Sequence, residues 1–405
     1  MTVSAPTRPR LLGAVWALLA INTLGSQGAV TILSVPQAVY QLVTMGSLLA
    51  AFTIALLLNP RLRIRPNAFC VLLSLLLLVS LVSTARLEAG AGGLFRCGRF
   101  ALFIATLWLV TPWWGAAMTF VRHHVRTFAA LLVPVVLGLL VAPGYALPET
   151  YDGRIVGAIW PLTPPQVGQY AAVVVGLVAV LWLTRRTDRT SVLLLGVPAV
   201  GLLLLSYTRT ATIGVLAGLT LAGLALILTS TRARRFLGVG VLVAVVAAVA
   251  FAPAITAWLR RGQDDESFGD LTGRQKVWDA LLAAPRDTGE YLFGTGLSNK
   301  TFGGLPIDSS WLAVFHEQGV VGVGIVVIML GTLLVTALLR PPSPARACAV
   351  FLIVYCAFAS YTEVGLGDAS PYLLHLAVAA ALLATPDSPL GSVDEPREEA
   401  APQAR

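Results

Sequence analysis

The chain has 405 residues, of which 57% are hydrophobic and 12% are charged, and its formal net charge is +8. Water-soluble domains carry about 25% charged residues and about 45–50% apolar residues, so this composition excludes a soluble globular domain. The basic residues lie in small clusters between apolar runs and form no continuous patch, which argues against nucleic acid as a partner. The composition instead indicates an integral membrane protein, whose first partner is the lipid bilayer.

Apolar runs of about 20 residues, the length that crosses a bilayer, follow one another along most of the chain. We predict an all-α polytopic membrane protein of about twelve transmembrane helices, formed by one domain over residues 1–385. Segment 386–405 is rich in proline, glutamate and small residues, and we expect a disordered cytoplasmic tail there. The predicted spans are 11–33, 38–58, 68–85, 96–113, 127–143, 166–184, 190–206, 209–230, 236–258, 309–338, 346–362 and 370–385.

Arginine clusters occur in every second joint between these spans. With a cytoplasmic N-terminus, all five inner joints are basic, whereas the outer joints carry mixed charges such as Glu363 with Asp368. This pattern agrees with the positive-inside rule and predicts that both termini are cytoplasmic. The inner-joint arginines are Arg61, Arg63, Arg65, Arg122, Arg126, Arg185, Arg186, Arg189, Arg232, Arg234, Arg235, Arg340 and Arg346.

The longest hydrophilic loop, about 259–308, joins the ninth and tenth predicted spans and is expected on the outer face of the membrane. Part of it has apolar residues at near-helical spacing, which predicts an amphipathic helix over the membrane surface, with Pro285 helping to end it. The apolar positions of this helix are Leu271, Val277, Trp278, Leu281 and Leu282.

Three arginines are not explained by the topology. Arg209 lies in a very short outer joint, where it either extends its charge to lipid headgroups or binds an anion. Arg154 precedes the sixth span on the same side, and Arg274 lies on the predicted loop helix. Each of the latter two is also compatible with an ordinary solvated charge, but together the three would form a cationic pocket.

Two residues near the tenth span are candidates for proton transfer. Asp308 opens this span, where it fits the N-cap of a helix, a catalytic base, or both. His316 lies deeper, and a packing role fits it at least as well as a chemical one. His375, in the twelfth span, is expected to be structural. No metal-ligand spacing occurs among the four cysteines, and we expect neither a metal nor a cofactor.

Four segments resemble the superfamily of O-antigen ligases and polysaccharide polymerases, which are polytopic membrane glycosyltransferases similar to the GT-C class. In chain order they are GRIVGAIWPLTPPQVGQY, SYTRTATIG, LTGRQKVW and GTGLSNKTFGGLPIDSSWLAVFHEQGVVG. The last segment contains the most specific features of the family, which are a Gly-x-Gly turn, His or Asp with a small polar residue, an aromatic-Leu pair and Glu-x-Gly. They correspond to Gly294 and Gly296, Asp308 and Ser309, Trp311 and Leu312, and Glu317 and Gly319.

The resemblance implies transfer of a glycan from an undecaprenyl-diphosphate carrier to an acceptor hydroxyl, at the outer face of the bacterial cytoplasmic membrane, in surface polysaccharide biosynthesis. Arginines would hold the negative charge on the leaving diphosphate, and Arg209, Arg274 and Arg154 are the candidates. Asp308, and after it His316, are the candidates for the base. The acidic run Asp264–Glu266 could suggest a metal, but the resemblance implies none.

Other functions remain open. Ligases of this superfamily usually have His where Asp308 stands, whereas polymerases vary there, so a polymerase with the same donor is the alternative. A secondary transporter also fits twelve spans, but the long loop is not central and no internal repeat is visible. A non-catalytic scaffold would leave Arg209, Arg274 and Asp308 without a shared purpose.

Overall fold

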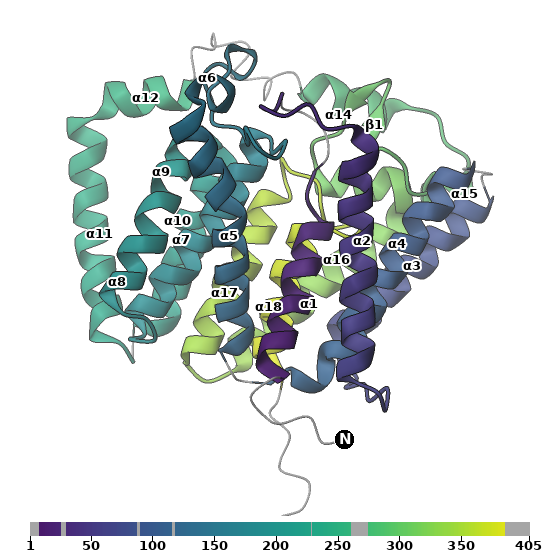
Figure 1. Ribbon diagram of the computed structural model, residues 1–405, viewed down its shortest axis with the longest axis horizontal. Coiled ribbons are helices and arrows are strands. Elements are labelled where there is room, and N and C mark those ends of the chain that lie inside the picture. The colour runs from purple at the N-terminus through teal and green to yellow at the C-terminus, as the bar shows by residue number, and fades with distance from the viewer. Residues whose placement is uncertain are drawn as a thin grey trace, which may run out of the picture.

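The computed structural model describes residues 8–25, 30–86, 90–115, 118–227, 229–260 and 274–384 (Figure 1). The predicted tail, the acidic run at 264–266 and Leu271 lie outside this part of the chain. The first half of the described chain contains α1 (Arg8–Asn22), α2 (Gln37–Leu58), α3 (Ala68–Arg86), α4 (Gly90–Val110), η1 (Thr111–Trp113), α5 (Thr119–Val141), α6 (Pro143–Ala146), η2 (Glu149–Tyr151) and α7 (Pro164–Leu183).

The second half contains α8 (Arg189–Ser191), the π-helical turn η3 (Val192–Gly196), α9 (Val197–Leu205), α10 (Arg209–Leu226), α11 (Thr231–Ala250), α12 (Ala252–Arg260), α14 (Arg274–Ala283), α15 (Thr288–Phe293), β1 (Thr301–Phe302), β2 (Leu305–Pro306), α16 (Ser310–Leu339), α17 (Pro344–Ala359) and α18 (Pro371–Leu383). The strands form one small antiparallel hairpin, in which Thr301 pairs with Pro306.

The chain is an all-α membrane protein. Seven helices of the described residues are long and apolar enough to cross a bilayer, and four shorter apolar helices accompany them. The seven are Gln37–Leu58, Ala68–Ala85, Ala91–Trp113, Thr119–Val141, Pro164–Leu183, Arg209–Leu226 and Ser310–Leu339. The four shorter ones are Arg10–Asn22, Arg189–Leu205, Pro344–Ala359 and Pro371–Leu383.

Burial divides the bundle into central and peripheral helices. Helices α7, α17 and α18 are mostly buried, because other helices cover them on nearly all sides. Peripheral helices instead expose large apolar side chains, such as Leu57 of α2 (75% exposed) and Val249 of α11 (79% exposed). Exposed apolar surface of this extent is costly in water and suits contact with lipid.

Close packing at the centre depends on small residues. A Cβ atom at Gly218 of α10 would lie 2.8 Å from the Phe351 ring of α17, and one at Gly176 of α7 would lie 1.7 Å from the same ring. Helix association in lipid relies on such close approach, because burial of apolar surface drives it only weakly. The three helices α7, α10 and α17 therefore form the rigid support for the residues at their ends.

The predicted ninth span, 236–258, is wrong as a single helix. Helix α11 ends at Ala250, and Phe251 separates it from α12, which runs across the top of the bundle (Figure 1). Pro253 lies in the first turn of α12, where its missing N–H and fixed φ are best tolerated at a helix start. The end of this apolar run thus lies on the surface of the bundle.

The predicted helix of the large loop is confirmed as α14. It ends at Ala283, two residues before Pro285, and it buries Val277, Trp278 and Leu281. Leu282 was expected on the same face but is 58% exposed. The indole N–H of Trp278 donates to the backbone oxygen of Ile307 at 2.7 Å, so α14 is held against the segment that leads into α16.

Helix α16 is broken near its first third, at Gly319, which has a φ of 65° and a ψ of −166°. The break frees backbone carbonyls, and the turn after α15 satisfies them. Thr295 N–H donates to the His316 oxygen at 2.8 Å, and Gly296 N–H donates to the Glu317 oxygen at 3.0 Å. Non-helical backbone within a membrane protein requires such internal partners. The Gly-x-Gly and Glu-x-Gly sequences therefore form one interlocked structure.

Replacing Gly319 with alanine is expected to prevent normal folding. The new Cβ would lie 2.3 Å from the Leu292 oxygen, and a positive φ is strained for alanine. We expect a loss of at least about 2 kcal/mol in the free energy of unfolding. Gly324→Ala is the matched control, because Gly324 lies on the same helix with nothing within 4 Å of its Cβ position.

Thermal unfolding in detergent, together with the yield of monodisperse protein, measures the effect. Gly324→Ala should match or exceed the wild-type unfolding temperature, since alanine is the better helix former. Equal stability of the Gly319 and Gly324 variants would contradict the interlocked arrangement.

Candidate functional site

Charged residues from five separate segments meet at one end of the bundle. They come from the loop before α7, the start of α10, the start of α14, the residue pair before α16 and the turn between α17 and α18. The residues are Arg154, Arg209, Arg274, Asp308 and Glu363, which we call the end cluster. Four of them were candidates from the sequence, and the structure brings these four together.

Arg274 and Asp308 form an ion pair. The Arg274 Nε atom lies 3.2 Å from Asp308 Oδ2, and the side chains are 25% and 39% exposed. This partial exposure leaves both groups accessible to a ligand. Arg274 is the first residue of α14, so the contact between Trp278 and Ile307 places it beside Asp308.

Asp308 is not the N-cap of α16. Ser309 occupies the N-cap position, with no hydrogen bond from its side chain to the helix, and Asp308 precedes it with a left-handed backbone at φ 42°. Non-glycine residues seldom adopt this conformation, although Asp and Asn tolerate it best. The capping interpretation is therefore wrong, and the carboxylate is directed to Arg274 instead.

Arg154 links its loop to the joint between α9 and α10. Its Nε atom donates to the Ser206 backbone oxygen at 2.9 Å, and Nη2 lies 3.5 Å from the Thr208 hydroxyl. Burial lowers the pKa of Arg154, Glu363 raises it, and the charges of Arg274 and Arg209 lower it. The three arginines are thus close enough to repel one another, which favours an anionic ligand.

Arg209 is the first residue of α10, and Thr208 is its N-cap. The first-turn N–H groups of a helix carry partial positive charge and have no partners within the helix, so this end suits an anion. The Thr208 hydroxyl donates to the Pro164 oxygen at 3.2 Å, which joins the start of α10 to the start of α7. Two helix N-termini therefore meet beside Arg209.

Glu363 is a member of the cluster that the sequence analysis counted only as an outer-joint charge. The pKa of Glu363 is raised to about 7, chiefly by burial; the charge of Arg274 lowers this pKa, that of Asp308 raises it and that of Arg154 lowers it. The Glu363 backbone oxygen accepts a 2.7 Å hydrogen bond from the Ser310 hydroxyl. A carboxylate in a short joint between two apolar runs was the signal that could have identified it.

His316 does not join the end cluster. Its ring packs edge-on against Phe302, with centroids 5.8 Å apart, and the charge that influences it most among the described residues is that of Arg286. Its backbone oxygen is occupied by Thr295. The structure thus separates the two base candidates and leaves Asp308 beside the arginines.

The neighbouring Glu317 has a structural partner. It is 1% exposed, and Ser298 donates to its Oε1 atom from both the backbone N–H, at 2.7 Å, and the hydroxyl, at 3.0 Å. This contact adds to the interlock between α16 and the turn after α15. The family-like Glu-x-Gly sequence therefore has a folding role here.

His375 is fully buried, in agreement with a structural role. It lies 2.8 Å from His124 Nε2 through its Nδ1 atom, and Trp16 donates to the other His124 nitrogen at 2.9 Å. The four cysteines are buried and free. Among the described residues, no group of three or more histidine, cysteine or acidic side chains could hold a metal ion.

The composition of the end cluster suits an anionic ligand. Three arginines face two carboxylates, one of which, Glu363, is half-protonated near neutral pH. A diphosphate would compete with Asp308 for Arg274 and would meet the N-terminus of α10 beside Arg209. In comparisons with known proteins, no protein-family model and no curated protein matches the chain.

Proposed function

We propose that the chain is a membrane glycosyltransferase that moves a glycan from an undecaprenyl-diphosphate carrier to an acceptor hydroxyl, in the manner of O-antigen ligases. The observation that carries this proposal is the convergence of Arg154, Arg209 and Arg274 with Asp308 at one end of the bundle. An anion site beside a carboxylate base matches the two demands of this reaction, which are stabilisation of a leaving diphosphate and activation of a hydroxyl.

In the proposed reaction the acceptor oxygen attacks the anomeric carbon of the sugar, and the bond from this carbon to the diphosphate oxygen breaks. The proton of the acceptor hydroxyl passes to Asp308. Arg209 and Arg274 stabilise the negative charge that develops on the diphosphate. Arg154, in the loop before α7, adds a third positive charge to the same site. Arg274 connects the diphosphate site with the base, since its Nε atom lies 3.2 Å from Asp308 Oδ2.

The proposal includes a topology of twelve spans in the bacterial cytoplasmic membrane, with both termini in the cytoplasm and the end cluster on the outer face. The positive-inside pattern of the arginines supports this orientation. The loop that contains α14 then forms the roof of the carrier-diphosphate site. Reaction of periplasm-restricted thiol reagents with single cysteines placed at Tyr361 and Arg61 would test the two faces, with only the former expected to react.

A polysaccharide polymerase with the same donor is the second candidate, and Asp308 favours it, because ligases of the superfamily usually have His there. Deleting the gene and examining the lipid-linked glycans distinguishes them. Single repeat units should accumulate if a polymerase is lost, and full-length lipid-linked chains should accumulate if a ligase is lost. Unchanged pools would contradict both.

A transporter is less well supported. Secondary transporters bind substrate near the middle of the membrane, at discontinuous helices. Here the charged cluster lies at helix ends, and the broken helix α16 has its free carbonyls occupied by Thr295 and Gly296. This arrangement favours a site at the membrane surface.

Diphosphate binding is expected to weaken as the pH rises through about 7, the raised pKa of Glu363. Below this pH Glu363 is protonated and neutral, and above it the added negative charge opposes the anion held by Arg154 and Arg274. We expect the dissociation constant of a polyprenyl diphosphate to rise on the order of tenfold across this range. The Glu363→Gln protein should show only the change in dissociation constant that comes from titration of the ligand itself.

The ligand titrates equally with both proteins, so the difference between wild type and Glu363→Gln isolates this side chain. Isothermal titration calorimetry in detergent, at a series of pH values, provides the measurement. If the dissociation constants of the two proteins depended on pH in the same way, the charge of Glu363 would have no effect on diphosphate binding.

A further inference from the structure

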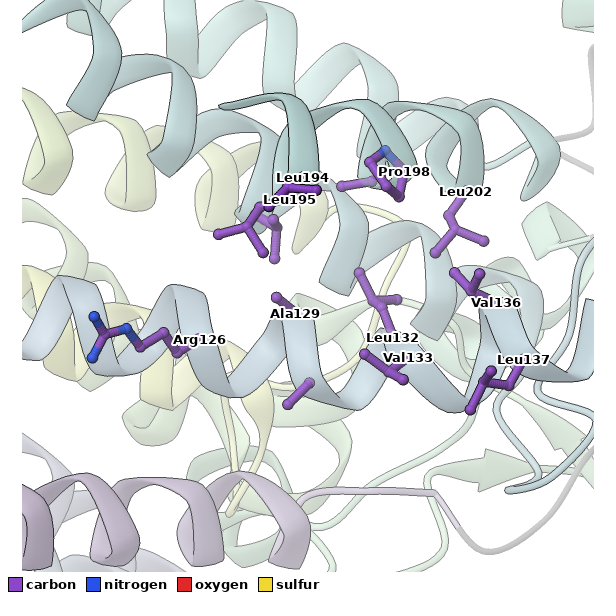
Figure 2. Close-up of a pocket in the computed structure, with 13 residues that line it drawn as sticks. Arg126, Ala129, Leu132, Val133, Val136, Leu137, Leu194, Leu195, Pro198 and Leu202 are labelled. Carbon is purple, nitrogen blue, oxygen red and sulfur yellow. The ribbon is translucent and has the colours of Figure 1, made fainter. Parts of the chain in front are cut away.

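A groove opens on the side of the bundle. A cavity of about 350 Å³ lies between α5 and the segment formed by η3 and α9, with α7 behind it (Figure 2). Figure 2 shows Leu132 and Val136 of α5 facing Leu195 and Leu202 of the opposite segment. The volume falls within the range of about 300–1,000 Å³ that ligand pockets occupy. The lining is apolar except for Arg126 at one end.

A second cavity, of about 520 Å³, continues the groove beyond Arg126. The two cavities share Arg126 and Leu195, so an apolar section leads directly into a polar one. The polar section is lined by four arginines and one aspartate, a net charge of +3. The arginines are Arg122, Arg126, Arg185 and Arg186, and all four side chains are exposed.

The arginines are not neutralised by the aspartate in this cavity. Asp188 is the N-cap of α8, and its Oδ1 and Oδ2 atoms accept from the Ser191 hydroxyl, at 2.5 Å, and the Ser191 N–H, at 3.4 Å. The described residues show no ion pair between any of the four arginines and a carboxylate. The positive charge of the polar section, next to the apolar section, therefore suits a ligand with an anionic group and an apolar chain.

The wall of the groove has an irregular backbone. The η3 segment is a π-helical turn over Val192–Gly196, and it leads directly into α9, which begins at Val197 and has Pro198 in its first turn. Such single π turns widen a helix locally and occur often at functional sites. Here the turn presents Leu194 and Leu195 to the groove. The positive-inside rule accounts for the arginines of this region but not for a shaped groove beside them.

The polar section lies at the opposite end of the bundle from the end cluster. Helix α7 begins at Pro164, whose oxygen contacts Thr208, and ends at Leu183, next to Arg185 and Arg186. Twenty helical residues at about 1.5 Å per residue separate the two ends by about 30 Å, the thickness of a bilayer core. A lipid bound here would belong to the other leaflet.

We propose that this groove binds one anionic glycerophospholipid, with its phosphate at Arg122, Arg126, Arg185 and Arg186 and one acyl chain along α5 and α9. Basic pockets between transmembrane helices on the cytoplasmic side attract anionic headgroups, and the adjoining apolar section distinguishes a lipid from a free phosphate. The site does not depend on the proposed glycosyltransferase activity.

Native mass spectrometry of the purified full chain, titrated with phosphatidylglycerol or with phosphatidylcholine of identical acyl chains, tests the proposal. We expect phosphatidylglycerol to bind at least about tenfold more tightly than phosphatidylcholine. The double variants Arg122→Ala with Arg126→Ala, and Arg185→Ala with Arg186→Ala, should each lose this preference.

Arg61→Ala with Arg63→Ala is the matched control, because it removes two exposed arginines of another inner joint, outside the cavity. It should keep the preference. Ala129→Phe narrows the apolar section without changing charge, and it should weaken binding of both lipids while an exposed Leu57→Phe change on α2 should not. Where a double variant fails to fold, Arg126→Gln alone tests the arginine that both cavities share.

Equal affinity of the wild type for the two lipids would overturn the proposal. So would an equally large loss in the Arg61 and Arg63 control, since the effect would then come from net charge. Tighter binding of a polyprenyl phosphate than of phosphatidylglycerol would also overturn the proposal, and so would complete displacement of the lipid by inorganic phosphate. In either case the glycerophospholipid would not be the occupant of the groove.

Discussion

Arg209→Ala is expected to lower glycan transfer by about 10²–10³-fold while the protein still folds and inserts. Arg209 begins α10, and its charge adds to the positive end of the helix at the place where the leaving diphosphate would lie. The loss should fall mainly on kcat, because the charge that Arg209 stabilises is largest in the transition state. Transfer by purified protein in proteoliposomes, with a lipid-linked glycan donor, provides the measurement.

Arg96→Ala is the matched control for Arg209. Arg96 is an arginine of α4 that hydrogen-bonds Asn299, and it has no contact with the end cluster among the described residues. Its removal changes the net charge equally and should leave transfer within about twofold of wild type. Full activity of Arg209→Ala, or an equal loss in Arg96→Ala, would contradict the assigned role.

Asp308→Asn is expected to lower transfer by about 10²–10⁴-fold, the usual contribution of a general base. Asparagine keeps the size of the side chain and tolerates the left-handed backbone at this position, so the fold should remain. It removes both the proton acceptor and the negative charge beside Arg274. An alanine would add backbone strain, which makes asparagine the cleaner test.

A ligand-binding measurement separates the two effects of Asp308→Asn. Loss of the competing carboxylate should strengthen binding of polyprenyl diphosphate to Arg274, even though transfer is lost. His316→Asn is the control, because His316 packs on Phe302 outside the cluster, and it should retain transfer to within a few-fold. Loss of transfer in His316→Asn with retained activity in Asp308→Asn would reverse the assignment of the base.

The pattern of apolar runs and arginines was sufficient to predict an all-α membrane fold and to assign Arg154, Arg209, Arg274 and Asp308 to the same side of it, whereas their grouping in one site came from the family resemblance. Hydropathy reports the solvent of each segment, and charge in short joints reports which side each joint faces. These quantities are local, so they can be obtained from a single sequence. The catalytic roles and the twelve-span count remain predictions.

Features that depend on contacts between distant segments could not be predicted in this way. The apolar run 236–258 contains Pro253, but its hydropathy continues across the change of direction at Phe251, so hydropathy alone predicted one helix. Glu363 has an ordinary place in the sequence, and its raised pKa arises from burial in the folded chain. Asp308 looked like a helix cap, because nothing local showed that Ser309 would take that position.

The interlock at Gly319 determines which parts of the chain can be exchanged between related proteins. The turn at Gly294–Gly296 and the first turns of α16 satisfy each other's backbone groups, with Gly294 so close that a Cβ there would lie 2.3 Å from the Gln318 nitrogen. A chimera that imported the loop before α16 alone would leave carbonyls of a foreign α16 without donors. Residues 288–319 therefore have to be exchanged together if α16 is to keep its break at Gly319.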